Sequence, residues 1–497
     1  MYLSKSKYCR VWQCPKMLWL DTYRPELHVP DAAVEARMAA GNEVGDLAMG
    51  LFGDFAETTA YKADGGLDIP AMLERTRLEM AKGTPVICEA AFSFGGLYCA
   101  VDLLKKEDGG WAIYEVKSAA DPKKTVYLAD VAYQKYVLQN CGVRVTGTYL
   151  VTINSQYVFN GTLRLDELFT VTDVSDDLPS EEKAVPSVLE TAAATLKRAA
   201  EPETEIGAQC RSPYECEYWG YCTRALPQPN VFNLYRIRFD KALDCYSGGD
   251  IAYEDLLRHG RVTNKTQLRQ IDFALHNRGV YADAAAIRKF LGTLSFPLYF
   301  LDFETMQPAV PRYIGTRPYQ QIPFQYSLHV LDREGGELRH KEFLAESGPD
   351  PRRALAERLC ADIPQNVCVT AYNKGFECGR IKELAAAFPD LSEHLLNIES
   401  NIKDLLTPFQ QGWYYTREMG GSFSIKSVLP ALFPNDPRLD YHALEGVHNG
   451  TEAMDIFPRI ESMGPAEKEA ARENLLRYCE LDTLAMVRVW EKLKAVI

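Results

Sequence analysis

PLYFLDFETM, residues 297–306, is an apolar run that ends in two acids. Its aromatic and aliphatic residues predict a buried strand of an α/β fold. Because side chains alternate along a strand, Asp302 and Glu304 leave the same face and point to one place. Two carboxylates at the end of a buried strand repel each other and are costly to bury. A bound divalent cation would remove that cost, so the stretch predicts a metal site.

Two later segments carry acids in a similar setting. VCVTAYNKGFECGRIKELAAAF, residues 367–388, predicts a strand, a turn and a helix, with Glu377 at the junction. ARENLLRYCELDTLAMVRVW, residues 471–490, predicts a helix on which Tyr478 and Asp482 share a face. Four acids from three segments can bind two metal ions about 3.5–4 Å apart, as in enzymes that hydrolyse phosphodiesters. One ion would activate the water, which Tyr478 could orient, and the other would stabilise the leaving oxygen.

This series resembles the DEDD exonuclease superfamily, whose domains have an RNase H-like fold. The motifs D-x-E, N-x2-(F/Y)-D and Y-x3-D of that superfamily are matched by Asp302 with Glu304, by residues 373–377 and by Tyr478 with Asp482. Glu377 stands where the middle motif has Asp, which lengthens this ligand by one methylene, and the nearby Asp404 is a further acid that could compensate. The resemblance implies a 3′–5′ exonuclease with a mixed sheet flanked by helices and with Mg²⁺ or Mn²⁺ as cofactor.

The front half contains a second group of acids. PVICEAAFSFGGLYCAVDLLKKEDGGWAIYEVKSA, residues 85–119, predicts a β-hairpin with a turn at EDGG. Glu115 and Lys117 leave one face of the second strand, and Asp102 can approach Glu115 across the hairpin. These carboxylates can hold a cation, with Glu89 as a further ligand, while Lys117 orients water or stabilises charge on a phosphate. The alternative is a solvated hairpin with an ordinary cross-strand ion pair.

Asp102 followed by Glu115-x-Lys117 resembles the PD-(D/E)xK nuclease signature. The next segment, YLADVAYQKYVLQNCG, predicts a helix that carries Gln134 and Tyr136. RecB-type nucleases place a glutamine-and-tyrosine helix next to the metal site. The resemblance therefore implies catalytic roles for Lys117, Gln134 and Tyr136 and metal-binding roles for the acids.

One position departs from the RecB pattern. Many RecB-type enzymes have a metal-binding histidine on an early helix, and in GNEVGDLAMG, residues 41–50, Gly45 stands at that place. The metal site of this chain would then be formed by carboxylates alone, or its activity would be weakened.

Four cysteines bracket the front half. Cys210, Cys216 and Cys222 lie in CRSPYECEYWGYC, and Cys14 lies far upstream in QCPKMLWL. Four thiolates can ligate an iron–sulfur cluster, which would close this half into one loop. The alternatives are a zinc site at the same cysteines, although zinc sites usually have closer C-x2-C pairs, and buried free thiols. The layout resembles the iron–sulfur RecB family, which includes the CRISPR-adaptation nucleases, and it implies a 4Fe–4S cluster.

The chain of 497 residues is too long for one hydrophobic core. RALPQPNVFN, residues 224–233, has the prolines and asparagines of a domain boundary. We expect a RecB-like iron–sulfur nuclease domain at residues 1–225, a helical connector at 226–295 and an RNase H-like exonuclease domain at 296–497. The acidic stretch at 173–187 predicts a surface loop that precedes a helix.

Composition restricts the setting in which the protein acts. The first residues lack the layout of a signal peptide, and no apolar run approaches the ~20 residues that span a bilayer. We therefore expect a cytoplasmic protein with no membrane partner, in which 13 cysteines do not form a disulfide framework. A net charge of −13 argues against coating nucleic acid over the whole surface, but a local basic groove can still guide a phosphate backbone.

The two halves together resemble a bacterial family described only as predicted RecB-type nucleases. That resemblance implies processing of DNA with free ends, in repair or in defence. Two alternatives remain open. In the first, which Gly45 favours, the front half is a DNA-end-binding module whose nuclease has decayed. In the second, the rear half is an RNA 3′–5′ exonuclease, since the sequence does not reveal recognition of the 2′-hydroxyl.

Overall fold

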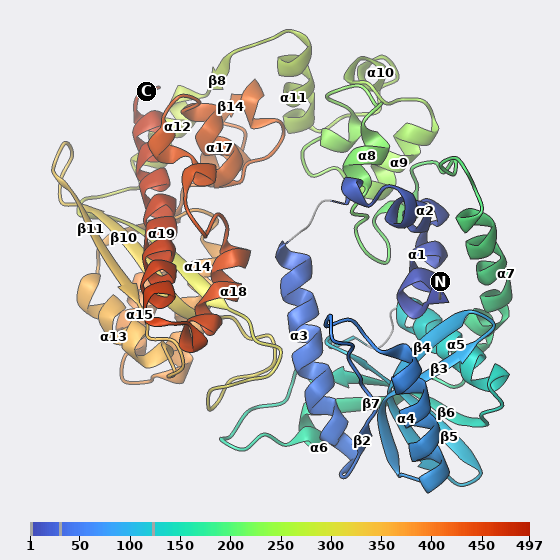
Figure 1. The fold of residues 1–497 in the computed structure, drawn as a ribbon. Helices are drawn as coiled ribbons and strands as arrows, with labels where there is room; N and C mark the ends of the chain where they lie inside the picture. Colours follow the sequence, from blue (N-terminus) through green and yellow to red (C-terminus); the bar gives the residue numbers. More distant parts are fainter. Residues whose placement is uncertain (1–2, 29–31, 122–124) are drawn as a thin grey trace. The chain divides into compact units, whose positions relative to one another are not determined.

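The protein has a mixed α/β architecture, seen in a computed structural model that describes residues 3–28, 32–121 and 125–497 (Figure 1). It divides into two compact units, each described by itself. Unit 1 comprises Met1–Ala225 and Pro308–Tyr319, and unit 2 comprises Leu226–Gln307 and Gln320–Ile497. The expected connector at 226–295 therefore groups with unit 2, and residues 308–319, which follow the first strand of the rear sheet, group with unit 1.

Unit 1 is built on a mixed sheet in which β2 to β7 lie in sequence order and β1 pairs with β4. Its strands are β1 (Leu3–Ser4), β2 (Ala56–Glu57), β3 (Val86–Phe94), β4 (Leu97–Glu107), β5 (Gly110–Lys117), β6 (Val145–Ile153) and β7 (Phe169–Asp173). The β3–β4 and β4–β5 pairs are antiparallel, as the hairpin pattern predicts, whereas β5 and β6 are parallel. A parallel pair needs a crossover, and helix α5 provides it.

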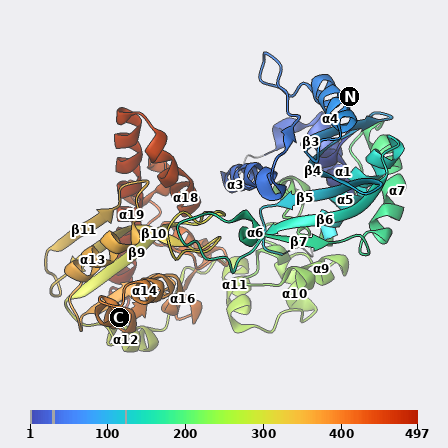
Figure 2. The same ribbon diagram turned by 90° about the horizontal axis from the view of Figure 1, so that it is seen from below.

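Helices cover both faces of this sheet (Figure 2). They are α1 (Lys5–Gln13), α2 (Pro15–Tyr23), α3 (Ala32–Ala48), α4 (Ile69–Lys82), α5 (Thr125–Asn140), α6 (Leu165–Leu168), α7 (Pro179–Leu196) and α8 (Trp219–Thr223). Helix α5 packs on the face that carries Leu104 and Ile113, and α3 packs on the face that carries Leu103 and Tyr114. This division follows the alternation of side chains along β4 and β5.

Our prediction of a surface loop at residues 173–187 is wrong from Pro179 onward. Helix α7 already begins at Pro179, and its first turn contains Glu181 and Glu182. Proline at the first helical position and acids in the first turn are favourable because the first amides of a helix are unpaired and carry partial positive charge. The composition that we interpreted as a loop is therefore that of a helix start.

Unit 2 contains a five-stranded mixed sheet in the order β11-β10-β9-β12-β13. Its strands are β9 (Leu298–Met306), β10 (Ile322–Leu331), β11 (Leu338–Leu344), β12 (Cys368–Ala371) and β13 (Ile402–Asp404), and a separate small sheet joins β8 (Val280–Ala282) to β14 (Tyr414–Thr416). The apolar run quoted first is the central strand, β9, which is antiparallel to β10 and parallel to β12.

The helices of unit 2 lie on both faces of its sheet and in residues 226–295, where we expected a connector. They are α9 (Phe239–Ser247), α10 (Tyr253–Arg258), α11 (Lys265–Leu275), α12 (Ala284–Leu291), α13 (Arg352–Asp362), α14 (Gly375–Ala387), α15 (Ser392–Ser400), α16 (Thr407–Gln410), α17 (Ile425–Leu432), α18 (Gly450–Arg459) and α19 (Pro465–Lys494). Among the described residues, none of the helices has the length and apolar content needed to cross a bilayer.

The two faces of β9 have different neighbours. Leu301 and Phe303 pack in a core with residues of α13, α14 and α15, whereas Leu298 and Phe300 pack against the end of α19. By alternation, Asp302 and Glu304 leave the face that α19 covers. Figure 1 shows α19 crossing the strands of this sheet.

Candidate metal-binding sites

The acids predicted in the rear half come together beside β9. Glu304 and Asp482 are buried, as is Glu377 in the first turn of α14. Asp302, Glu304 and the thiol of Cys479 offer ligand atoms that lie within 4.8 Å of one another. The negative charges of Asp482, Glu304 and Glu377 all act on Asp302. The structure therefore gathers the four acids that the sequence singled out.

Burial makes this group of acids unfavourable in its charged form. Desolvation, followed by repulsion from Asp482, holds the pKa of Asp302 and of Glu304 well above the usual range. Burial also raises the pKa of Asp482, and it raises the pKa of Glu377 to about 8. Within the described residues, Oε2 of Glu377 is buried without a hydrogen-bond partner. A divalent cation fits this donor set, since it would offset the repulsion and give Glu377 a partner.

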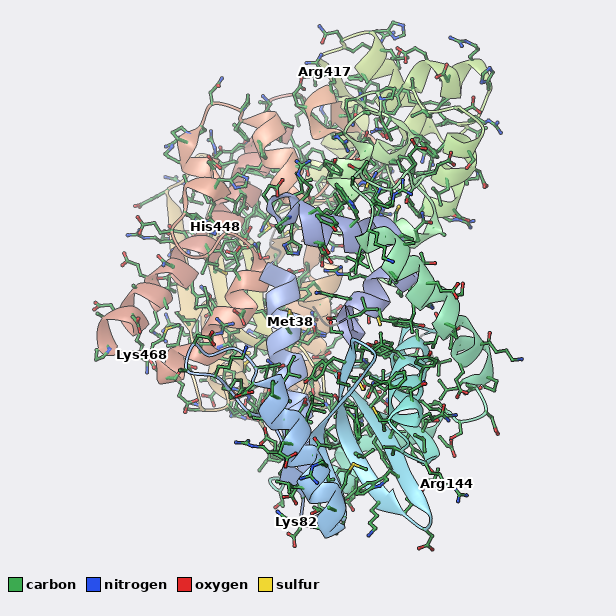
Figure 3. All side chains as sticks on the ribbon, turned by 45° about the vertical axis from the view of Figure 1, so that its right-hand side comes forward. Met38, Lys82, Arg144, Arg417, His448 and Lys468 are labelled. Carbon is green, nitrogen blue, oxygen red and sulfur yellow. The ribbon has the colours of Figure 1, made fainter. Side chains whose placement is uncertain are left out.

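Two further residues, neither of which we predicted, act on these acids, one by a hydrogen bond and one by its charge. The hydroxyl of Tyr441 donates a hydrogen bond of 2.6 Å to Oδ1 of Asp482. The Nζ atom of Lys426, on α17, lies 5.2 Å and 5.1 Å from the ring centres of Tyr441 and Tyr478. It also donates to the backbone oxygen of His448, which is labelled in Figure 3. Neither residue was a predicted site residue, and each comes near the acids only through the fold.

The turn that delivers Glu377 is held by Asp404. Asn373 has a φ of 68°, a left-handed conformation that asparagine tolerates better than most residues. Oδ1 of Asp404 accepts the backbone N–H of Asn373 at 2.9 Å, and its Oδ2 accepts that of Lys374 at 3.3 Å. Asp404 therefore stabilises the junction of β12 and α14, rather than offering a free carboxylate to compensate for Glu377 in place of Asp.

The front acids form a row across three neighbouring strands. Pairing of Cys88 with Leu103 and of Ala90 with Val101 places Glu89 opposite Asp102. The β4–β5 ladder ends one residue short of Asp102, and Oδ2 of Asp102 accepts the amide of Val116 at 2.7 Å. Strands β4 and β5 thus diverge at the level of Asp102 and Val116.

Strand β1 lies along the edge of β4 at the level where β5 no longer pairs with β4. Strand β1 pairs with Leu97 and Tyr98 at the beginning of β4. Since β3 lies along the other edge of β4 there, β1 lies on the same edge as β5. Lys5 follows β1 directly and its Nζ is 2.6 Å from Oε1 of Glu115.

Glu115 is the centre of this site, with only 1% of its surface exposed. Its Oε1 also accepts from Lys117 at 2.8 Å, and its Oε2 accepts from Nε2 of Gln134 at 2.6 Å. Asp130, one turn before Gln134 on α5, pairs with Lys117 and accepts from the thiol of Cys9. The predicted Lys117 and Gln134 therefore contact the predicted acid, and Lys5 and Asp130 are members that we did not expect.

The three acids of the row differ in charge state. Burial, and then repulsion from Asp102, raises the pKa of Glu89 to about 7, and burial with repulsion from Glu115 raises that of Asp102 to about 6. Burial alone would also raise the pKa of Glu115, but Lys117 and Lys5 outweigh it and hold that pKa below the usual range. A cation that binds Glu115 would therefore compete with two ammonium groups, whereas at Glu89 and Asp102 burial and repulsion outweigh the effect of the lysines.

Tyr136 does not join this site. It is two residues from Gln134, which places it about 200° around the helix, and in the described structure its ring packs with the core on α5 rather than against the acids. The tyrosine ring near the site belongs to Tyr127, whose centre is 5.2 Å from Nζ of Lys117. Tyr136 and Gln134 therefore lie on different sides of α5, and a catalytic role for Tyr136 stays a prediction.

Gly45 lies on α3, the helix on the other face of the sheet. A Cβ atom at this position would meet no atom within 4 Å. The backbone there has room for a larger side chain.

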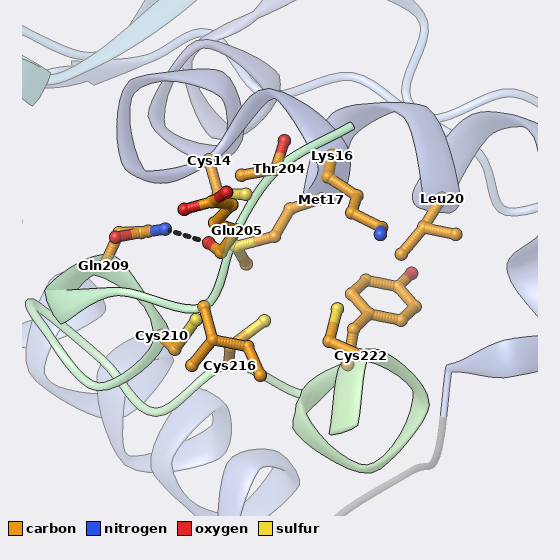
Figure 4. A pocket seen from close by; sticks show the side chains of 12 residues that line it. Cys14, Lys16, Met17, Leu20, Thr204, Glu205, Gln209, Cys210, Cys216 and Cys222 are labelled. Carbon is orange, nitrogen blue, oxygen red and sulfur yellow. Dashed lines mark hydrogen bonds between the residues drawn. The ribbon is translucent and has the colours of Figure 1, made fainter. Parts of the chain in front are cut away.

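The four predicted cluster cysteines line one pocket of unit 1 (Figure 4). It encloses about 350 Å³, part of it open to solvent, and Met17 and Tyr218 also line it. Burial raises the pKa of Cys216 to about 12, and it raises the pKa of Cys210 and Cys222 as well. Thiols in such a place are poor nucleophiles without a metal to stabilise their charge.

Sulfur spacing bears on which metal these cysteines fit. A single zinc ion with bonds of about 2.3 Å would hold its sulfurs about 3.8 Å apart. Among the described residues, the groups of three ligand atoms within 4.8 Å of one another do not include these cysteines. A cluster holds its thiolates further apart because its iron–sulfur core lies between them. Four thiols around one pocket are the donor set that a 4Fe–4S cluster requires.

Comparison with known proteins gives one match. The model of a family described as a domain of unknown function (DUF2779) matches residues 299–424. This region runs from β9 to the start of α17 and covers about a quarter of the chain. It contains Asp302, Glu304 and Glu377 and the short Pro308–Tyr319 segment of unit 1, but neither Asp482 nor the Met1–Ala225 segment of unit 1. No curated protein and no solved structure matches the chain.

Proposed function

We propose that the protein is a metal-dependent nuclease and that unit 2 is its 3′–5′ exonuclease domain, with an RNase H-like fold. One observation carries the proposal: four acids from β9, α14 and α19, three of them buried, meet at one place without enough positive charge to balance them. A central strand that carries the first two acids, antiparallel to one neighbour and parallel to the other, supports the fold.

Different residues of unit 2 would have different roles in hydrolysis. Asp302, Glu304, Glu377 and Asp482 would hold two divalent cations, which when bound supply an activated water and stabilise the leaving oxygen. Tyr441 fixes the orientation of Asp482 through its hydrogen bond. Tyr478 is placed to orient the water, and Lys426 offers a positive charge to the phosphate.

A cleavage assay tests this proposal. Anaerobically purified full-length protein is incubated with Mg²⁺ or Mn²⁺ and end-labelled DNA or RNA, single- or double-stranded. Asp302→Asn and Asp482→Asn should each lower the rate of 3′-end shortening about 100-fold or more, because a missing ligand costs several kcal/mol of transition-state stabilisation. Glu473→Gln, an exposed acid on α19, is the matched control. If the two variants degrade ends as wild type does, the exonuclease site is elsewhere.

The same assay decides between polymers. DNA with free ends is the proposed substrate, in repair or defence in the cytoplasm. Shortening of RNA in preference to DNA would instead support the RNA exonuclease alternative.

We also propose that unit 1 is a RecB-like PD-(D/E)xK nuclease domain. The supporting observation is the row of Glu89, Asp102 and Glu115 with Lys117 among them. The helix–three strands–helix–strand order from α4 to β6 agrees with it. The competing function, a DNA-end-binding module, is favoured by Lys5, which together with Lys117 already neutralises Glu115.

Lys117→Ala separates these two functions for unit 1. If unit 1 cuts, this variant loses a product that Asp302→Asn retains, while DNA-end binding persists. If unit 1 only binds, the products of Lys117→Ala and wild type are identical. Arg144→Ala, an exposed cation of the same unit labelled in Figure 3, is the control.

Cys14, Cys210, Cys216 and Cys222 are proposed to hold a 4Fe–4S cluster. Iron and zinc analysis of the anaerobic protein distinguishes the two metals. Cys216→Ser should lose most of its iron, whereas Cys141→Ser, an exposed cysteine of unit 1, should retain it. Full iron content in Cys216→Ser would exclude this residue as a ligand.

A further inference from the structure

Two histidines and a glutamate of unit 2 form a cluster that the proposed nuclease chemistry does not use. His329 on β10 and His340 on β11 are directly opposite in the antiparallel ladder, and their ring centres are 4.6 Å apart. Glu480 on α19 lies beside them, with its Oε1 3.8 Å from Nδ1 of His340. One nitrogen of each ring and one oxygen of Glu480 lie within 4.8 Å of one another.

Hydroxyl groups on the inner side of the cluster bind the other ring nitrogens. Nδ1 of His329 is 2.8 Å from Oγ1 of Thr483, and Nε2 of His340 is 2.8 Å from Oγ of Ser327. The two hydroxyls are 2.6 Å apart, and that of Thr483 also donates to the backbone oxygen of Glu480 at 3.1 Å.

One arrangement of protons satisfies all four contacts. A backbone oxygen only accepts, so Thr483 gives its one proton to Glu480 and must accept from Ser327 and from His329. Ser327 has then used its proton and must accept from His340. His329 therefore carries its proton on Nδ1 and His340 on Nε2, which leaves Nε2 of His329 and Nδ1 of His340 with lone pairs when the rings are neutral.

The surroundings keep His329 neutral. Its burial, and then the nearby His340, lowers the pKa of His329 to about 4. A neutral imidazole whose second nitrogen donates to a fixed acceptor is the usual form of a metal-ligating histidine. Exposure increases outward, from 4% for His329 to a side-chain value of 47% for Glu480, so a cation can enter from solvent.

We propose that His329, His340 and Glu480 bind one borderline transition-metal dication, with Zn²⁺ as the representative ion. Two imidazoles with one carboxylate favour such ions over Mg²⁺ or Ca²⁺, which prefer oxygen ligands. Three protein ligands would leave a further position for water. The ion ties β10 and β11 to α19, the helix that carries Tyr478 and Asp482, and thereby stabilises the placement of that helix on the sheet.

The competing arrangement is an ion pair between protonated His340 and Glu480. It needs no metal, and zinc binding distinguishes the two. The test does not depend on nuclease activity, so it can succeed or fail independently of the proposed function.

Equilibrium dialysis of the full-length, cluster-loaded protein against Zn²⁺ provides the test. Excess Mg²⁺ is included to occupy sites made of oxygen ligands alone. Wild type should bind one zinc ion per chain more than His340→Gln or Glu480→Gln. Zinc should also raise the Tm of wild type and leave that of both variants unchanged, because a ligand stabilises only the folded state that binds it.

Two controls make the result specific. Glu473→Gln changes another acid of α19 and should bind zinc as wild type does. Glu480 is half-exposed, so Glu480→Gln folds even if His340→Gln does not. Equal zinc stoichiometry in wild type and Glu480→Gln, or equal loss in Glu473→Gln, would overturn the site.

Discussion

At the scale of single residues, both acid groups contain a backbone conformation that is unfavourable in itself. Glu89 has a φ of 54° inside strand β3, and Asn373 has a φ of 68° before α14. A non-glycine residue in this region costs of order 1–3 kcal/mol and persists only where its surroundings impose it. Glu89 is itself a predicted metal ligand, and Asn373 lies in the turn that precedes Glu377, so the strain coincides with the two groups of acids.

Tyr441 provides a residue-scale test of the rear site. Tyr441→Phe removes the hydrogen bond to Asp482 without changing the size of the ring. Loss of an outer partner of a ligand should lower metal affinity or activity about 10–100-fold. The Mn²⁺ concentration that gives half of the maximal exonuclease rate measures the change in metal affinity.

Tyr326→Phe is the matched control for that substitution. Tyr326 is also a buried tyrosine of unit 2, and its hydroxyl also donates to a carboxylate, that of Asp362. It should reduce stability and leave the Mn²⁺ requirement unchanged. An equal rise in that requirement for both variants would mean that Tyr441 acts only through folding.

At the scale of elements, unit 2 relies on a buried carboxylate that joins α13 to the sheet. Asp362, at the end of α13, accepts from Tyr326 on β10 at 2.7 Å and from Lys341 on β11 at 2.9 Å. Arg358 on the same helix adds a further hydrogen bond. Burial opposes the charge of Asp362, but these donors outweigh it and lower its pKa.

Asp362→Asn tests this joint through pH. Because the folded pKa of Asp362 is below its unfolded value, its contribution is present above that unfolded pKa, about 4, and is lost as the pH falls through the folded pKa. At pH 7 the variant should be about 1–3 kcal/mol less stable, since the donors lose their charged partner. Thermal unfolding at pH 7 and below pH 4 should show the difference in Tm shrinking. A constant difference would contradict the lowered pKa.

In unit 1 the segment formed by β1 and α1 affects the charge balance around Glu115. It supplies Lys5 to Glu115 because β1 pairs with β4 where β5 has diverged. Lys5→Ala removes one positive charge next to Glu115, so Mn²⁺ should bind this site at least about tenfold more tightly, which is 1.4 kcal/mol. Titration followed by electron paramagnetic resonance, in an Asp302→Asn background, measures it. Lys7→Ala on the same helix should have no effect, and weaker binding in Lys5→Ala would show that Lys5 assists the metal instead.

At the scale of the whole molecule, the two sites belong to different compact units. Unit 1 is not a continuous segment, since Ala309 and Val310 are buried in its core and Thr316 pairs with Phe159. Cys14 and the late cysteines join the two ends of its long N-terminal segment at one pocket. Each unit thus has its own group of acids.

Loss of the proposed cluster should therefore affect one unit. Removing a link that closes a loop of about 200 residues should destabilise unit 1 by about 3–5 kcal/mol. In Cys216→Ser, calorimetry should show one transition moved to lower temperature, while 3′-end shortening by unit 2 is retained. Disappearance of both activities would show that the units do not fold independently.

The sequence by itself determined the local features that depend on near neighbours. Alternation placed Asp302 and Glu304 on one face, the hairpin turn paired β4 with β5, and the run at 297–306 is the central strand. The mixed α/β class and the gathering of the four rear acids also followed from motifs. The helical connector was visible as helices but not as part of unit 2.

Only the tertiary structure decided which distant residues meet. Lys5, Lys426 and Tyr441 were not predicted site residues, and they come near the acids because strand pairing and helix packing bring them there. Tyr136 lies on another side of α5 than Gln134 because a helix turns by about 100° per residue, so sequence proximity to Gln134 is not proximity to the site. His329, His340 and Glu480 lie on three elements that only sheet order and packing make adjacent. Such contacts depend on long-range geometry, which local patterns do not encode.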